Sequence, residues 1–186
     1  MIIHSAKARI IKPKRCASCR NDFFPNRPMQ KACGIECAQS LAKKKREKVE
    51  KVADRQKRES LKSRSQWLKE AQTAFNAFIR ARDADLLCIS CNRHHDGQWH
   101  AGHYLSTGAR PELRFDESNV HKQCQPCNTH LHGNLILYRV YLIKRRGYDE
   151  VTRLEGPHEA KHYSIEDLKV IKVIYVAKLR ELRNGN

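Results

Sequence analysis

The stretch "HAGHYLSTGARPELRFDESNVHKQCQPCN" (residues 100–128) gathers three histidines, two cysteines and two asparagines. Its cysteines, Cys124 and Cys127, form a C-x2-C pair that lies 32 residues after the pair Cys88 and Cys91. Two such pairs are typical of a structural zinc site that joins the ends of a small unit, with the insert forming a hairpin. The stretch therefore predicts a zinc-stapled unit. It leaves open whether the histidines are structural or catalytic.

A second group of four cysteines lies nearer the N-terminus, in "CASCRNDFFPNRPMQKACGIEC" (residues 16–37). Cys16, Cys19, Cys33 and Cys37 form two close pairs on a short loop, which suits tetrahedral zinc. All eight cysteines of the chain thus fall into four close pairs. In a reducing compartment such pairs indicate metal ligands, and a disulfide framework is the alternative.

The 186-residue chain carries 37 Lys and Arg against 20 acidic residues, a formal net charge of +17. This charge favours a polyanionic partner. The sequence has neither an 18-residue apolar run nor a signal-peptide core, so we expect a soluble intracellular protein with no membrane association. An anionic membrane surface is the weaker alternative, since no helix pairs a basic face with a strongly apolar one.

Helical patterns dominate the remaining sequence. Residues 38–66 hold 11 basic and 4 acidic residues with few apolar ones, which predicts an exposed helix. We expect it to contact phosphate through Lys43, Lys44, Lys45 and Arg46, the alternative being a solvated linker. Residues 67–80 predict an amphipathic helix that packs on the domain that follows. A short helix closed by Gly147 is also expected, as is a final helix that begins at Ser164.

The expected fold is α+β and mainly helical. It comprises an N-terminal zinc module (1–37), a basic then amphipathic helical arm (38–84), a zinc-stapled core (85–150) and a C-terminal helical segment (151–186). The apolar residues of the last segment cover more than one face, so that helix is either buried on both sides or meets a partner.

The stretch around the second cysteine group resembles the HNH, or ββα-metal, nucleases. In that family a histidine on the first strand is the general base and an asparagine in the loop orients it. The resemblance implies these roles for His103 and Asn119. It also implies that Asn128 holds a magnesium-class ion. The Cys-Asn ending at this position is similar to that of junction-resolving endonucleases of the endonuclease VII type, in which an asparagine oxygen is the metal ligand.

One position departs from the family pattern. The residue before the base is Gly102, which offers no side-chain ligand. We expect His100 to replace it, with four further residues as reserves: Asp116, His121, His130 and His132.

The longer segment "GHYLSTGARPELRFDESNVHKQCQPCNTHLHGNLILYRVYLIKRRG", the N-terminal cysteine module and the chain length resemble the NinG, or Rap, recombination proteins of lambdoid phages. This resemblance implies a metal-dependent endonuclease that cuts branched DNA, such as Holliday junctions and D-loops, in the cytoplasm of a bacterial host. The resemblance and the apolar final helix are compatible with a homodimer. The alternative is a non-catalytic, zinc-containing DNA-binding accessory protein.

The expected chemistry needs two kinds of metal. A neutral imidazole can remove a proton from water near pH 7, and Mg²⁺ or Mn²⁺ can offset charge on the scissile phosphate. The soft cysteine sites should hold Zn²⁺ instead. Further phosphate contacts are expected from basic residues in and after the core: Arg110, Arg114, Lys122, Arg139, Lys144, Arg145 and Arg146.

Overall fold

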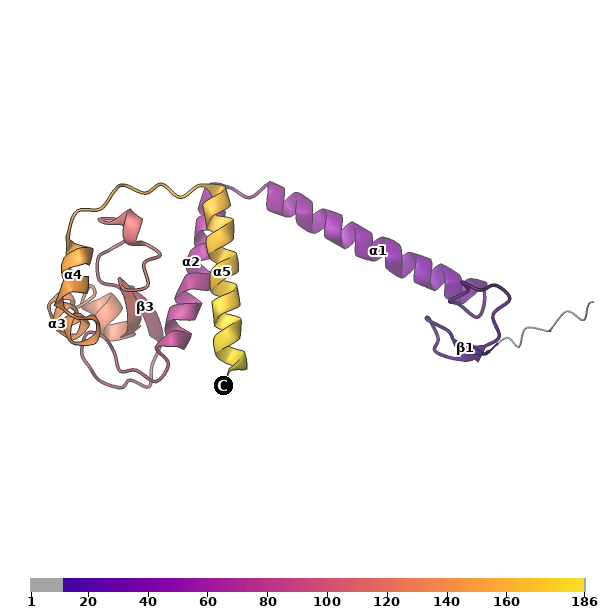
Figure 1. Cartoon of the computed structure of the whole chain (residues 1–186), viewed down its shortest axis with the longest axis horizontal. Coiled ribbons are helices and arrows are strands. Elements are labelled where there is room, and N and C mark those ends of the chain that lie inside the picture. Colours follow the sequence, from indigo (N-terminus) through magenta and orange to yellow (C-terminus); the bar gives the residue numbers. More distant parts are fainter. Residues whose placement is uncertain (1–11, 186) are drawn as a thin grey trace, which may run out of the picture. The chain divides into compact units, whose positions relative to one another are not determined.

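The computed structural model describes residues 12–185. The chain divides into two compact units, and the boundary between them in the sequence lies between Lys62 and Ser63 (Figure 1). The fold is mixed α/β and about half helical. No helix within residues 12–185 has the length and apolar content needed to cross a membrane.

The first unit consists of a small hairpin and one long helix. Strands β1 (Lys14–Arg15) and β2 (Asp22–Phe23) pair antiparallel, and helix α1 runs over Ile35–Ser60. None of the residues of α1 is buried. The exposed helix expected from its charged sequence is therefore confirmed, although it ends earlier than residue 66.

The helical arm is interrupted by a helix cap. Ser63 begins helix α2 (Arg64–Arg82) with a capping box, in which Ser63 Oγ accepts from Gln66 N and the Gln66 side chain accepts from Ser63 N. This cap separates α2 from α1 even though neither glycine nor proline lies between them. As a result α2 belongs to the second unit rather than to a continuous arm.

Helix α2 supplies one side of the main core. It packs against α5 (Ile165–Asn184), where the Phe75 and Tyr175 rings meet edge to face with centroids 4.7 Å apart. It also contacts both strands of the second hairpin. The expectation that residues 67–80 pack on the following domain is confirmed, as is the start of the final helix at Ser164 with a capping box.

The second hairpin joins β3 (Trp99–His103) to β4 (Val120–Cys124), with a short 3₁₀ turn, η1 (Pro111–Leu113), in the intervening loop. Its register pairs His100 with Gln123 and Gly102 with His121. A π-helical turn, η2 (Pro126–His130), follows β4. The expected hairpin between the cysteine pairs is confirmed.

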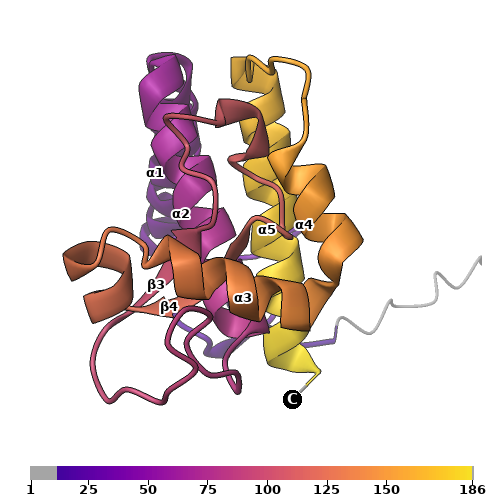
Figure 2. The ribbon, with the colours of Figure 1, turned by 90° about the vertical axis from the view of Figure 1, so that its left-hand side faces the viewer.

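Helices α3 (Leu135–Arg146) and α4 (Tyr148–Glu155) form a second core cluster beside the hairpin (Figure 2). The Tyr138 hydroxyl donates to Gly102 O at 2.9 Å, which fixes α3 on one face of β3. Helix α3 ends at Gly147, where φ is +89°, as the sequence predicts.

The final helix is not buried on both sides. Leu168 and Tyr175 of α5 lie in the core, whereas Val170, Val173 and Val176 are exposed. The expectation that this helix is buried on both sides is therefore wrong. The alternative, that its exposed side contacts a partner, remains a prediction.

Candidate functional site

The eight cysteines assemble into the two expected quartets. In each quartet the four sulfur atoms lie within 4.8 Å of one another, and no disulfide joins them. The quartets are Cys16, Cys19, Cys33 and Cys37 in the first unit, and Cys88, Cys91, Cys124 and Cys127 in the second. Four sulfurs at this separation suit a tetrahedral ion, so both quartets can hold zinc.

The quartet of the second unit is more deeply enclosed. Cys88, Cys124 and Cys127 are buried, and Cys124 N donates to Cys88 Sγ at 3.4 Å. Burial and the neighbouring Cys88 thiol raise the pKa of Cys91 to about 11. Four thiolates at such short distances need a cation to balance their charge, and zinc would supply it.

A pocket of about 560 Å³ lies at the end of β3. Its wall includes His103 from β3, Arg114 after η1, Asn128 from η2 and Gln72 from α2. His132 and Gly133, in the loop between η2 and α3, complete one side. The pocket therefore brings together two residues expected to act jointly, His103 and Asn128. The contribution of α2 was not foreseen, because nothing in its local pattern marks Gln72 as different from other polar helix residues.

His103 is held in one tautomer by the loop before β4. Its Nε2 atom lies 3.0 Å from Arg114 O, and since a carbonyl only accepts, Nε2 carries the proton. The other ring nitrogen, Nδ1, then has a free lone pair. Burial lowers the pKa of His103 below its ordinary value, so the ring is neutral at pH 7. These are the properties that a general base requires.

Asn119 acts on the loop and does not touch the His103 ring. It is fully buried, its Oδ1 accepts from Leu105 N at 2.8 Å, and its Nδ2 donates to Leu105 O and Leu113 O. The direct contact that we expected between Asn119 and the imidazole is thus replaced by an indirect one. Because Leu113 precedes Arg114, Asn119 fixes the segment whose carbonyl orients His103.

His100 lies on the other face of the strand. Side chains alternate along β3, so residues three apart point in opposite directions, and His100 does not line the pocket. The expectation that His100 joins Asn128 around one ion is corrected by this alternation.

The space beside Gly102 is occupied by Gln123. A Cβ atom built on Gly102 would lie 2.0 Å from Gln123 Oε1. Gln123 is fully buried, and within residues 12–185 neither its Oε1 nor Nε2 of His100, its cross-strand neighbour, has a hydrogen-bond partner. Position 102 therefore has no room for the ligand that the family pattern usually places there.

Only one of the reserve ligands lies in the pocket. His132 lines it, in a backbone conformation with φ of +47°. Asp116 instead pairs with Arg153 at 2.8 Å. His121 is fully buried, which lowers its pKa to about 3. His130 is not part of the pocket wall.

Several basic residues of the second unit are engaged within the fold. Lys122 is buried, with Nζ donating to Ala84 O at 2.6 Å and lying 4.3 Å from the Trp99 ring centroid. This corrects the expectation that Lys122 reaches phosphate. Arg110 and Arg139 form ion pairs with Glu112 and Glu155.

Three other basic residues remain available to a ligand. Arg114 lines the pocket, where its Nη1 donates to Gln72 Oε1 at 3.2 Å, and Lys144 and Arg146 are exposed on α3. Arg145 is half-buried, and its Nη1 has no hydrogen-bond partner.

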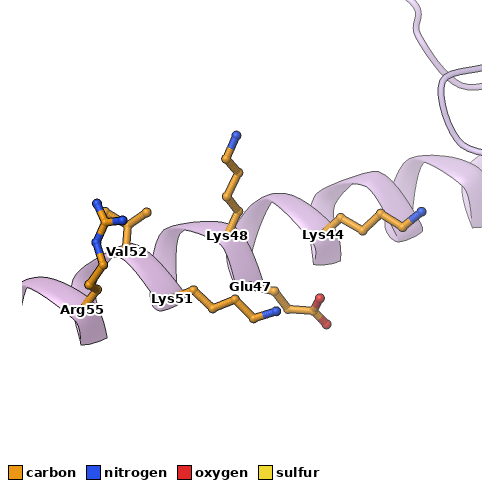
Figure 3. A pocket seen from close by; sticks show the side chains of 6 residues that line it. All are labelled: Lys44, Glu47, Lys48, Lys51, Val52 and Arg55. Atoms are coloured by element: carbon orange, nitrogen blue, oxygen red, sulfur yellow. The ribbon is translucent and has the colours of Figure 1, made fainter. Parts of the chain in front are cut away.

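The first unit displays its charge along α1. Figure 3 shows Lys44, Lys48, Lys51 and Arg55 projecting from this helix, with Glu47 and Val52 among them, and these six residues line a pocket on α1. Lys43 to Arg46 are likewise not buried. The helix therefore offers a row of solvent-exposed cations.

The two cysteine quartets, the basic helix and the pocket together define the class of protein. It has a basic four-cysteine unit and a second unit in which a zinc-competent quartet staples a β-hairpin beside a histidine-lined pocket. A family model described as Bacteriophage Lambda NinG protein matches residues 8–185, and the chain belongs to this family. The expected membership in the NinG family is confirmed, whereas the expected likeness to the HNH nucleases remains a prediction.

Phage proteins are similar to this chain over nearly its whole length. It is 45% identical to Protein ninG of Escherichia phage lambda, with 92% of this chain and 94% of the relative covered. It is 44% identical to Protein ninG of Salmonella phage P22, covering 92% and 95%. No solved structure matches the chain.

Proposed function

We propose that the protein is an HNH-type, metal-dependent endonuclease that cuts branched DNA such as Holliday junctions and D-loops. The observation that carries the proposal is the pocket in which a neutral, oriented His103 lies with Asn128, His132 and Arg114. A pure binding module needs no half-buried histidine of fixed tautomer at the wall of a pocket.

The residues of the pocket suit phosphodiester hydrolysis. His103 Nδ1 removes a proton from water and the resulting hydroxide attacks phosphorus. The bond from phosphorus to the 3′ oxygen then breaks, and that oxygen takes up a proton from solvent and leaves as a 3′ hydroxyl. Arg114 places positive charge at the wall that the phosphate would face. Asn128 and His132 would hold Mg²⁺ or Mn²⁺, which when bound offsets negative charge on the phosphate.

DNA as the substrate is supported by the charge of +17 and by the cations of α1. The preference for branched DNA rests on the family resemblance alone. The two quartets, loaded with zinc, would have structural roles, because four sulfur ligands leave no open coordination position.

The test is cleavage of a labelled four-way junction with and without Mg²⁺ or Mn²⁺. His103→Ala should lower the cleavage rate by about 10²–10⁴-fold with junction affinity nearly unchanged, since phosphate contacts carry affinity. His94→Ala is the matched control, because His94 is an exposed histidine of the same unit outside the pocket. Asn128→Ala should cut slowly, and excess Mn²⁺ should partly restore its rate.

Two outcomes would count against the proposal. Cleavage by His103→Ala at the rate of the unaltered protein would remove His103 as the base. An unaltered protein that binds the junction but cuts it with neither metal would favour the alternative, a non-catalytic zinc-containing DNA-binding accessory protein.

A further inference from the structure

The outward side of α3 is apolar, although it faces solvent. Ile136 is 84% exposed and Val140 is 44% exposed, and they are one helical turn apart. The opposite side of the helix is the one that packs, through Tyr138 and Leu142, both fully buried. The α3 apolar face, defined here as Ile136 and Val140, is therefore not part of the core.

This face adjoins the pocket. Leu135, the first residue of α3 and the neighbour of Ile136, lines the pocket together with His103. The preceding residues His132, Gly133 and Asn134 all have positive φ values, of +47°, +93° and +45°. Glycine adopts such a conformation readily, but His132 and Asn134 keep theirs only where the surrounding structure supports them, which fixes the entry to α3 beside the pocket.

The charges on α3 indicate the chemistry of the partner. The helix contains no acidic residue, and although Arg139 pairs with Glu155 of α4, Lys144, Arg145 and Arg146 follow near its C-terminal end. Lys144 continues the line of Ile136 and Val140 at the same four-residue spacing, and it is exposed. An apolar surface in line with cations fits a ligand that has both flat apolar faces and negative charge.

We propose that Ile136 and Val140 stack against unpaired or unstacked bases of a nucleic acid whose backbone is bound by Lys144 and neighbouring cations. Apolar side chains such as isoleucine insert between base steps in other DNA-binding proteins at a cost in unstacking, and base faces are open without that cost only where the duplex is interrupted. The inference rests on the proposed function insofar as it places these bases beside the cleavage pocket. A second copy of the chain fits less well, since two molecules of charge +17 repel each other.

The experiment compares two double variants of the full, zinc-loaded chain. The test variant is Ile136→Ser with Val140→Ser. The control is Val170→Ser with Ile174→Ser, which has the same residue types and spacing on the exposed side of α5. Both are assayed without Mg²⁺ or Mn²⁺, so that no strand is cut, on a four-way junction and a linear duplex that carry 2-aminopurine.

The unaltered protein and the control should raise 2-aminopurine fluorescence at the branch point. The test variant should lose that increase and bind the junction about tenfold more weakly, as expected for a lost base-stacking contact. Its affinity for linear duplex and its salt dependence should not change, because the phosphate contacts remain.

Equal behaviour of the two variants would overturn the proposal. So would a change in sedimentation coefficient confined to the test variant, since that would identify the α3 apolar face as a protein interface. Because this assay measures base exposure and not cutting, it separates the two hypotheses. An unaltered protein that opens the branch point but never cuts would contradict the proposed function and leave this inference standing.

Discussion

Replacing Gly102 with alanine should destabilise the second unit, although a compatible Gly→Ala exchange usually stabilises a protein. The new Cβ atom would lie 2.0 Å from Oε1 and 2.9 Å from Cδ of Gln123. Non-bonded heavy atoms need about 3.5 Å. Either β3 or the Gln123 side chain must therefore move.

The Gln123 amide is not free to move. Its Nε2 donates to Ser90 Oγ and to Gly133 O, each at 2.6 Å. A lost hydrogen bond costs about 1 kcal/mol, and an unpaired buried carbonyl costs about 1–3 kcal/mol. Overpacking alone typically costs about 1–3 kcal/mol, so Gly102→Ala should lower the free energy of unfolding by about 2–4 kcal/mol.

The assay is urea unfolding of the zinc-loaded chain, followed by tryptophan fluorescence. Both tryptophans, Trp67 and Trp99, lie in the second unit, so the signal reports on that unit alone. Gly108→Ala is the control, because nothing lies within 4 Å of a Cβ atom there, and its effect should stay within about 0.5 kcal/mol.

A double-mutant cycle tests the cause. A Gln123→Ala background removes the contacts at 2.0 and 2.9 Å and leaves only the Cβ atom of residue 123, at 3.0 Å, close to the added methyl group. Gly102→Ala should therefore cost much less in that background, and the coupling energy should be about 2 kcal/mol. If Gly102→Ala costs the same in both backgrounds, or costs nothing in either, then Gln123 does not fill the space beside Gly102.

Three further predictions concern the zinc quartets, α1 and His121. The chain should bind two zinc ions, measured by native mass spectrometry. Cys124→Ser should abolish the cooperative fluorescence transition of the second unit, whereas Cys16→Ser should leave it intact; one ion per chain would contradict the two-site assignment. Neutralising Lys43–Arg46 together should weaken binding to every DNA shape and reduce the log–log salt slope by up to about 3.6, and an unchanged slope would make this stretch a solvated spacer. Burial lowers the pKa of His121 to about 3, below its usual unfolded value of about 6.5. The contribution of His121 to the free energy of unfolding is thus fully present above the unfolded pKa. It is lost as the pH decreases, by about 1 kcal/mol between pH 7 and pH 5.5. His121→Gln should lose that part of the pH dependence in urea titrations, and an identical loss in both proteins would show that another group is responsible.

Local patterns in the sequence were sufficient for most of the helices, for the hairpin between the cysteine pairs and for the metal quartets. Two cysteines with two or three residues between them, such as Cys88 and Cys91, can bind one ion from a single turn, so their pairing can be predicted without the tertiary fold. The final helix was predictable because Ser164 and Asp167 cap it through bonds between neighbours in the chain. The basic character of α1 follows directly from its composition.

The break between α1 and α2 was harder to see, although its signal is local. Ser63 and Gln66 form a capping box in a stretch that otherwise favours helix throughout. Helix propensity predicts helix formation only weakly. A capping residue inside a run of good helix formers does not change the spacing of the apolar residues, so that spacing does not reveal where one helix ends and the next begins.

The composition of the pocket was decided only by the tertiary structure. His103 and Asn128 share a wall with Gln72, which comes from a helix far away in the sequence. His100, three residues before His103, does not line the pocket because successive residues of a strand face opposite sides. Lys122 resembles any other basic residue in the sequence, yet packing against Trp99 buries it. Spacing along the chain determines which residues share a turn or a strand face. Which faces then meet depends on the packing of α2, the hairpin and α3 around one core, and that information is not local.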